Sequence, residues 1–338
     1  MMRSCEARAF RIVEQSGVGE ARRAAVTLAR RAGFGEVGCG RVALVVTEAA
    51  TNVVRHGGGG EVLVSQVEGP GGSVGLEVQA LDEGRGMADP AACLCDGYSS
   101  AGSRGEGLGA IGRLSSGFDL FSHPRQGTAV LCRLWADPAP PARADVELGA
   151  VSLPHPAETA RGDGWAAMAV EGRFILLVAD GLGHGPQAAS AARLAEDVLA
   201  REWRQSPAAV LQSVHEALRA TRGAAVAVAE VMTEERRVRF AGLGNVVARI
   251  ESQLASRVLV SLPGTAGHQA RQVQEFAYPW PDRAMLVVHT DGLATRWKLD
   301  QYPGLAGHLP GLAAGVLYRD HRRGKDDVTV VVMREAFR

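Results

Sequence analysis

Hydrophobic and polar positions in the first part of the chain alternate between helical and strand-like spacing. An Ala- and Arg-rich helix is predicted over residues 20–32, and a helix with a broad apolar face over 40–55. Apolar runs predict strands at 61–67, 74–81, 118–122 and 128–135, with a short helix at 108–115. This order predicts helices on one face of a mixed sheet.

The later part of the chain is dominated by strand patterns. Two adjacent helices are predicted at 186–203 and 207–221, and strands at 164–170, 174–179, 225–232, 237–242, 246–250, 285–289 and 328–333. Strands before and after a helix pair predict two packed sheets flanked by helices. The prolines at 138, 140 and 141 interrupt regular structure between the two parts. We therefore predict domains at 1–137 and 146–338, joined by a Pro-rich linker at 138–145.

Composition narrows the class of protein. At 338 residues the chain is long enough for two domains with their own cores. Its 46% hydrophobic and 22% charged residues are typical of soluble globular proteins. No uninterrupted apolar run approaches the roughly 20 residues that span a bilayer, and the start lacks the apolar core of a secretion signal. Because the formal net charge is zero, nothing indicates a nucleic-acid or membrane partner. We expect a cytoplasmic protein.

A polar stripe interrupts the second predicted helix. Glu48, Asn52 and His56 are spaced four apart and therefore share one face. The amide oxygen of Asn52 suits magnesium, and Glu48 is placed to orient or deprotonate an attacking hydroxyl. The alternative is a solvated helix edge that ends in a capping asparagine.

Two glycine motifs follow this helix. Asp82 ends a predicted strand and begins Asp-x-Gly-x-Gly-Met, where a carboxylate could accept the adenine amine while Gly84 and Gly86 let the backbone approach the ring. Gly105-x-Gly-Leu-Gly then opens a helix, whose free N–H groups favour phosphate. A lone glycine triplet is weak evidence, but the three elements in this order predict a nucleotide site.

These motifs resemble the N, G1 and G2 boxes of the GHKL ATPase fold. Over about residues 10–136 the chain is similar to bacterial RsbT-like anti-sigma serine kinases. The resemblance implies an α/β sandwich that binds ATP and Mg²⁺. Box by box, it implies Asn52 as the magnesium ligand, Glu48 as catalytic base, Asp82 at adenine, and Gly105, Gly107 and Gly109 around the phosphates. The short lid before Gly105 has no lysine, which leaves Arg104 or Arg55 for a cationic role there.

Aspartates follow or precede several apolar runs of the second part. They are Asp163, Asp180 before Gly181, Asp291 before Gly292, and the pair Asp326–Asp327. Carboxylates that converge at strand ends repel one another unless cations neutralise them. All-oxygen ligation favours magnesium or manganese over zinc. The alternative is a set of ordinary Asp-Gly turns between strands.

The order of these motifs looks like that of the metal-dependent type 2C protein phosphatases, in the small SpoIIE/RsbX-like bacterial branch. The similarity spans about residues 146–334 and implies an α-β-β-α sandwich that binds two Mn²⁺ or Mg²⁺ ions. It implies Asp180 as the bridging ligand, Gly181 as a carbonyl ligand, and Asp291 and Asp326 as the remaining ligands. Asp326 ranks above Asp327, Asp163 acts through a water or another ligand, and His184 either acts as an acid or shapes its glycine loop.

The fusion implies a chain that both adds and removes phosphate. By resemblance, it phosphorylates Ser or Thr of a STAS-domain regulator with its first domain and dephosphorylates it with its second, in a stressosome-like or sigma-factor pathway. A downstream regulator or sigma factor is a further possible partner. Two alternatives remain for the first domain: an ATP-loaded module that sequesters a partner, or a nucleotide-sensing module that regulates only the phosphatase.

Overall fold

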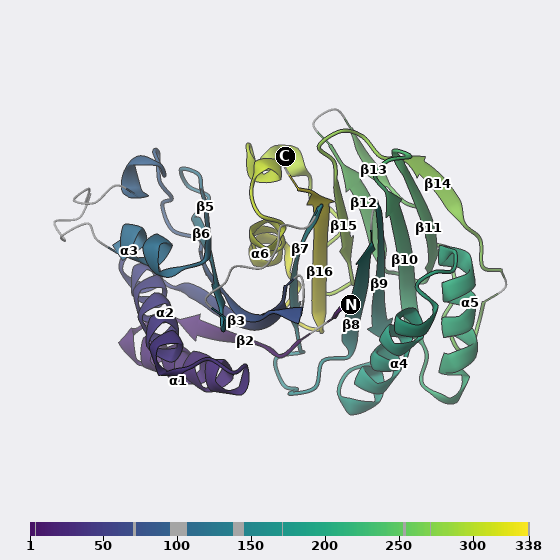
Figure 1. The fold of residues 1–338 in the computed structure, drawn as a ribbon, viewed down its shortest axis with the longest axis horizontal. Coiled ribbons are helices and arrows are strands. Elements are labelled where there is room, and N and C mark those ends of the chain that lie inside the picture. Colours follow the sequence, from purple (N-terminus) through teal and green to yellow (C-terminus); the bar gives the residue numbers. More distant parts are fainter. Residues whose placement is uncertain are drawn as a thin grey trace. The chain divides into compact units, whose positions relative to one another are not determined.

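The chain folds into two compact units. The computed structural model describes residues 1–3, 5–69, 72–94, 107–137, 145–170, 172–252, 255–270 and 272–336. Its contacts separate a first unit, Cys5–Arg143, from a second unit formed by Met1–Ser4 together with Ala144–Arg338 (Figure 1). All of the predicted linker except residue 145 lies outside the described residues, so the domain boundary stays a prediction.

The first unit is built on one five-stranded sheet with the order β2-β3-β4-β6-β5. The strands are β2 (Ala7–Ile12), β3 (Gly60–Glu68), β4 (Val74–Asp82), β5 (Gly117–Ser122) and β6 (Thr128–Trp135). The prediction of a mixed sheet is wrong, because every pairing among these strands is antiparallel. Short connections such as the β5–β6 turn reverse the chain direction, as a hairpin requires. The strand β2 was not predicted.

Three helices pack together on one face of this sheet. They are α1 (Gln15–Arg31), α2 (Glu36–Gly57) and α3 (Gly107–Leu114), and a one-turn 3-10 helix covers Ala92–Leu94. Figure 1 shows α1 and α2 on the same side of the sheet. Side chains of α2 such as Val42, Val46 and Ala50 are fully buried in a shared core with the sheet. By length and composition alone α2 could cross a membrane, which the sequence analysis did not anticipate, but here it is the core helix of the unit.

The second unit contains two sheets. The first has the order β1-β8-β9-β10-β11-β14 and the second the order β13-β12-β15-β16-β7, and the named strands pair only antiparallel in the described residues. The first sheet comprises β1 (Met2–Arg3), β8 (Asp163–Val170), β9 (Arg173–Gly181), β10 (Ala224–Met232), β11 (Arg237–Leu243) and β14 (Phe276–Pro279). The second comprises β7 (Val146–Leu153), β12 (Val247–Glu251), β13 (Ser256–Val258), β15 (Met285–His289) and β16 (Val328–Glu335).

Helices complete four layers in this unit. The helices are α4 (Pro186–Glu202), α5 (Pro207–Ala217) and α6 (Pro310–His321), with 3-10 turns at Leu218–Ala220, Leu299–Gln301 and Leu305–Gly307. One apolar core lies between the two sheets, and a second lies between the first sheet and the pair α4 and α5. Helix α6 packs on β7 and β16 of the second sheet. The arrangement confirms the predicted α-β-β-α sandwich.

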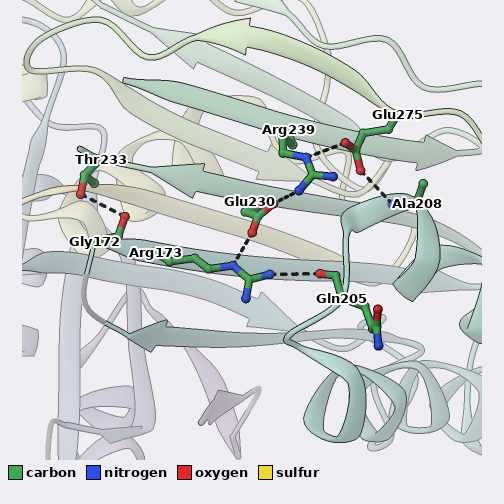
Figure 2. Close-up of polar contacts among 8 residues, drawn as sticks. All are labelled: Gly172, Arg173, Gln205, Ala208, Glu230, Thr233, Arg239 and Glu275. Carbon is green, nitrogen blue, oxygen red and sulfur yellow. Dashed lines mark hydrogen bonds and ion pairs between the residues drawn. The ribbon is translucent and has the colours of Figure 1, made fainter. Parts of the chain in front are cut away.

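A chain of charged side chains ties α5 to the first sheet (Figure 2). Glu230 of β10 is 2% exposed and forms ion pairs with Arg173 of β9 and with Arg239 of β11. Arg239 also donates to Glu275 at 2.5 Å, and Glu275 accepts the N–H of Ala208 in the first turn of α5. Because Glu230 is buried between two cations, its charge is compensated inside the fold.

Candidate nucleotide and metal sites

A cavity of about 380 Å³ opens in the first unit beside α2, the end of β4 and the start of α3. Asn52 and His56 of the predicted polar stripe line it, together with Asp82, Gly86 and Gly107. Its apolar wall includes Val53, Leu108 and Val130. A mostly apolar cleft with a few polar groups is typical of a small-molecule site. The three sequence motifs therefore meet at one cavity.

Asp82 is fixed by backbone groups at the end of β4. Its side chain is 7% exposed, and its Oδ1 accepts the N–H of Gly84 at 2.9 Å and that of Thr128 at 3.2 Å. The end of α2 packs tightly on it, since a Cβ added to Gly57 would lie 2.4 Å from the Asp82 Cβ. The carboxylate is thus held rigidly at the cavity wall, as a base-reading group requires.

The two glycines after Asp82 serve the turn itself. Gly86 has φ 65°, and a Cβ there would lie 2.0 Å from the carbonyl oxygen of His123. A Cβ on Gly84 would lie 2.7 Å from the Gly57 Cα. Side chains are therefore excluded by the protein's own backbone at both positions. Of the two, Gly86 lines the cavity.

Glu48 and Asn52 of α2 lie beside the start of α3. A Cβ added to Gly107 would lie 3.5 Å from Glu48 Oε2 and 3.6 Å from Asn52 Oδ1, so the start of α3 passes directly over both side chains. Glu48 itself does not line the cavity in the described part of the unit. Phosphate binding by the N–H groups at the start of α3 stays a prediction.

The structure describes some of the other residues that the sequence placed around ATP. Gly109 lies within α3 and is not among the described residues that line the cavity, whereas Gly105 and Arg104 lie outside the described residues. Arg55 also does not line the cavity, but Arg85 does. The sequence analysis missed Arg85, although it stands inside the Asp-x-Gly-Arg-Gly motif. The roles of these residues toward ATP stay predictions.

In the second unit, two aspartates of the first sheet lie side by side. Asp163 begins β8 and is the cross-strand partner of Asp180 near the end of β9. Asp163 is 4% exposed, and the Thr290 hydroxyl donates to its Oδ2 at 2.7 Å. Burial and then the charge of Asp180 raise the pKa of Asp163 well above its usual value. Thr290 accepts the N–H of Thr329 in turn, so β16 positions this donor.

The second sheet contributes two further carboxylates to the same group. Burial, then the charges of Asp291 and Asp326, raise the pKa of Asp180 to about 7. Burial and then Asp326 raise the pKa of Asp291 as well. The Asn245 side chain donates to Asp291 at 2.7 Å. Negative charge from both sheets therefore collects at one end of the sandwich, which is typical of a cation site.

The residues fit divalent ions that keep part of their water shell. In the described ranges, no three His, Cys, Asp or Glu side chains converge closely enough to enclose an ion by themselves. Magnesium and manganese do not require that, because they accept few protein oxygens and retain waters. Gly181 adds a backbone oxygen from a crowded position, where a Cβ would lie 2.5 Å from the Ala188 carbonyl oxygen. Ligation by Asp180, Gly181, Asp291 and Asp326 stays a prediction.

Asp326 and Asp327 are adjacent in the chain, but their side chains contact different groups. Asp326 is exposed, and its Oδ1 accepts the N–H of Asp327 at 2.9 Å. Asp327 is 3% exposed and accepts the N–H of His155 at 2.9 Å. Burial raises the pKa of Asp327, and the N–H groups of His155 and Gly162 oppose that rise. Asp327 thus holds the segment before β8, which favours Asp326 as the ligand.

His184 braces its glycine loop. Its ring stacks on that of His155 with centroids 5.1 Å apart, and its Nδ1 forms a hydrogen bond with Glu158 Oε1 at 2.8 Å. These contacts are those of a residue that shapes the loop. A role as proton donor stays a prediction.

Comparison with known proteins finds a family match in each unit. Residues 13–133 match the family described as a histidine kinase-like ATPase domain, and residues 170–335 match the stage II sporulation protein E (SpoIIE) family. The serine/threonine-protein kinase RsbT of Bacillus subtilis strain 168 is 32% identical over 125 residues, which are 37% of this chain and 93% of RsbT. A solved chain of "the bacterial stressosome: a modular system that has been adapted to control secondary messenger signaling" is 28% identical with a TM-score of 0.53, covering 56% of this chain and 100% of that one.

The two matches occupy different parts of the chain and correspond to the two units. They support an enzyme with a dual regulatory role that uses ATP and divalent metal. The chain belongs to the RsbT-containing family of histidine kinase-like ATPases through its first unit, and it fuses that GHKL domain to a domain that matches the SpoIIE family.

Proposed function

We propose that this chain is a bifunctional switch that phosphorylates and dephosphorylates Ser or Thr of a STAS-domain regulator. The pathway is a stressosome-like or sigma-factor pathway in the cytoplasm, with a downstream regulator or sigma factor as a further partner. One observation carries the proposal: a nucleotide-type cavity and a carboxylate cluster occur in separate units of one chain. The likeness to RsbT, a serine/threonine-protein kinase, supports the direction of the first reaction.

In the first unit, bound Mg²⁺-ATP supplies the γ-phosphoryl group. Asp82 holds the adenine amine, Asn52 holds the metal, and the start of α3 contacts the phosphates. Glu48 accepts the proton of the substrate hydroxyl, and the oxygen of that hydroxyl bonds to the γ-phosphorus. The bond between the γ-phosphorus and the bridging oxygen breaks, and ADP leaves.

In the second unit, Asp180 and the Gly181 carbonyl would hold two divalent ions from the first sheet, and Asp291 and Asp326 from the second. When bound, the ions would supply an activated water and neutralise the phosphoryl oxygens. Asp163 keeps Asp180 oriented, and Thr290 keeps Asp163 oriented. Water adds to phosphorus as the ester bond breaks, giving the free Ser or Thr hydroxyl and inorganic phosphate.

Full-length protein mixed with a STAS-domain protein and γ-labelled ATP tests the proposal. Asp180→Asn should accumulate label on the partner, Asn52→Ala should add none, and wild type with Mn²⁺ should release label from pre-labelled partner. A partner that gains label from wild type and never loses it with Mn²⁺ would contradict the bifunctional reading. Because both reactions together consume ATP without effect, we expect the partner or a signal to favour one site at a time.

Two observations favour a second candidate function, in which the first unit only binds ATP and sequesters a partner. Glu48 does not line the cavity in the described residues, and the lid lacks a lysine. Glu48→Gln separates the candidates. A binding module keeps its partner affinity and has no labelling to lose, whereas a kinase loses labelling and keeps affinity.

A further inference from the structure

Arg222 lies over the glycine loop of the phosphatase site. It stands two residues before β10, and the next residue, Gly223, accepts the Leu182 N–H with its carbonyl oxygen at 3.0 Å. A Cβ added to Gly183 would lie 3.2 Å from Arg222 Nη1. The guanidinium therefore sits above the loop that follows Asp180.

Arg323 approaches the same carboxylates from the second sheet. Its backbone N–H donates to the Gly292 carbonyl oxygen at 2.8 Å, directly after Asp291. Its charge interacts with that of the Asp291 carboxylate. Arg222 thus lies beside the loop that follows Asp180, and Arg323 lies beside the turn that follows Asp291.

Both guanidinium groups are available for a ligand. Each residue is exposed, and neither side chain has a hydrogen bond or ion pair within the described ranges. Arg161, whose charge acts on Asp327, differs: its guanidinium donates to the carbonyl oxygens of Asp163 and Ser152. Arg161 is therefore engaged in holding the fold, while Arg222 and Arg323 are not.

An acidic site that hydrolyses a phosphomonoester has to attract a dianion. Bound metal ions would compensate the carboxylates and part of the phosphate charge, and further cations would hold the remaining phosphoryl oxygens. Arginine suits this task because its planar fork matches phosphate bidentately and it never loses its charge. We propose that Arg222 and Arg323 bind the phosphoryl group of a phosphoserine or phosphothreonine substrate at the mouth of the phosphatase site. The inference rests on the proposed phosphatase activity.

Kinetics of the full-length protein with Mn²⁺ and a phosphoserine peptide provide the first test. Arg222→Gln and Arg323→Gln should each raise KM about 10- to 100-fold with little change in kcat, because each removes charge-assisted hydrogen bonds to bound substrate. The matched controls are Arg219→Gln and Arg257→Gln, which replace exposed arginines at the 3-10 turn after α5 and on β13. Both controls should leave KM unchanged.

A second test measures binding without turnover. Fluorescence anisotropy compares a labelled phosphopeptide with its unphosphorylated form on wild type and the four variants, with Mn²⁺ present. Phosphate-dependent binding that either site variant weakens supports the inference, even if wild type hydrolyses nothing and the proposed activity fails. An unchanged KM together with unchanged binding overturns it. So does a variant that shifts only the Mn²⁺ requirement, since the arginine would then merely balance the carboxylates.

Discussion

Replacing Asp180 with asparagine should stabilise the metal-free protein while it abolishes phosphatase activity. In the fold, burial and the charges of Asp291 and Asp326 raise the Asp180 pKa from 3.8 to about 7. The folded chain therefore keeps a proton that the unfolded chain has lost, and stability falls as pH rises from about 4 to about 7. Asparagine has the same shape and carries no charge, so it removes this penalty. Its side-chain oxygen can still accept the Asp291 N–H.

The magnitude follows from the shift. A change of about 3 pKa units corresponds to about 4 kcal/mol as an upper limit above pH 7, and at pH 5 the same calculation leaves about 2 kcal/mol. For a unit of this size, 1 kcal/mol moves the melting temperature by about 2–4 °C. Asp180→Asn should thus raise the melting temperature of the second unit by at most about 8–16 °C at pH 8 and by about half as much at pH 5.

Calorimetry of the full-length protein in EDTA measures this directly. The transition of the first unit provides an internal reference, because the substitution lies outside it. Ala225, the cross-strand neighbour of Asp180 on β10, offers a matched control as Ala225→Ser, which changes no charge. A melting temperature for Asp180→Asn that is unchanged or lower at pH 8, or a gain no larger than at pH 5, would refute the reasoning.

Three further predictions concern the adenine site, the Mn²⁺ affinity and the ion pairs of Glu230. Asp82→Asn should lower ATP affinity about 10- to 100-fold with little loss of stability, because asparagine keeps an acceptor for the Gly84 N–H. Asp82→Ala should lower both ATP affinity and stability. Titration calorimetry measures the affinity, and thermal melting measures the stability. Mn²⁺ affinity should fall as pH drops through about 7, because Asp180 then takes up a proton, which a metal titration at several pH values measures. Glu230→Ala should cost about 2–3 kcal/mol in urea unfolding because it removes the buried carboxylate that pairs with both Arg173 and Arg239, and Glu230→Gln should cost less.

Local pattern was enough to find most elements of the fold. The strands at Thr128–Trp135 and Met285–His289 were predicted with the bounds that the structure has, because their apolar runs end in turn residues. Helix α6 was missed for a physical reason. Every residue from Pro310 to Arg319 is buried, so the helix shows no polar face and no 3.6-residue period. A helix enclosed on all sides resembles any other apolar segment in sequence.

The site could be predicted only where its residues stand in motifs. Asp82 and Asp180 are recognisable because a carboxylate follows an apolar run and precedes glycine. Their supporting contacts have no local signature: Thr128 contacts Asp82 across 46 residues, and Thr290 contacts Asp163 across 127. The separate contacts of Asp326 and Asp327 likewise depend on the distant His155 segment. Such pairings emerge only from the sheet register.

The two-residue strand β1 determines how the phosphatase domain can be isolated. Met2 and Arg3 pair with Ala167 and Ala166 of β8, although the next 139 residues in the chain, Cys5–Arg143, belong to the other unit. A fragment cut at the predicted linker would lack this strand, and β8 would present open N–H and C=O groups to solvent. Exposed strand edges of this kind recruit other chains. Self-association of such a fragment would therefore be an artefact of the cut, and a faithful fragment needs residues 1–3 joined back to it through a short flexible segment.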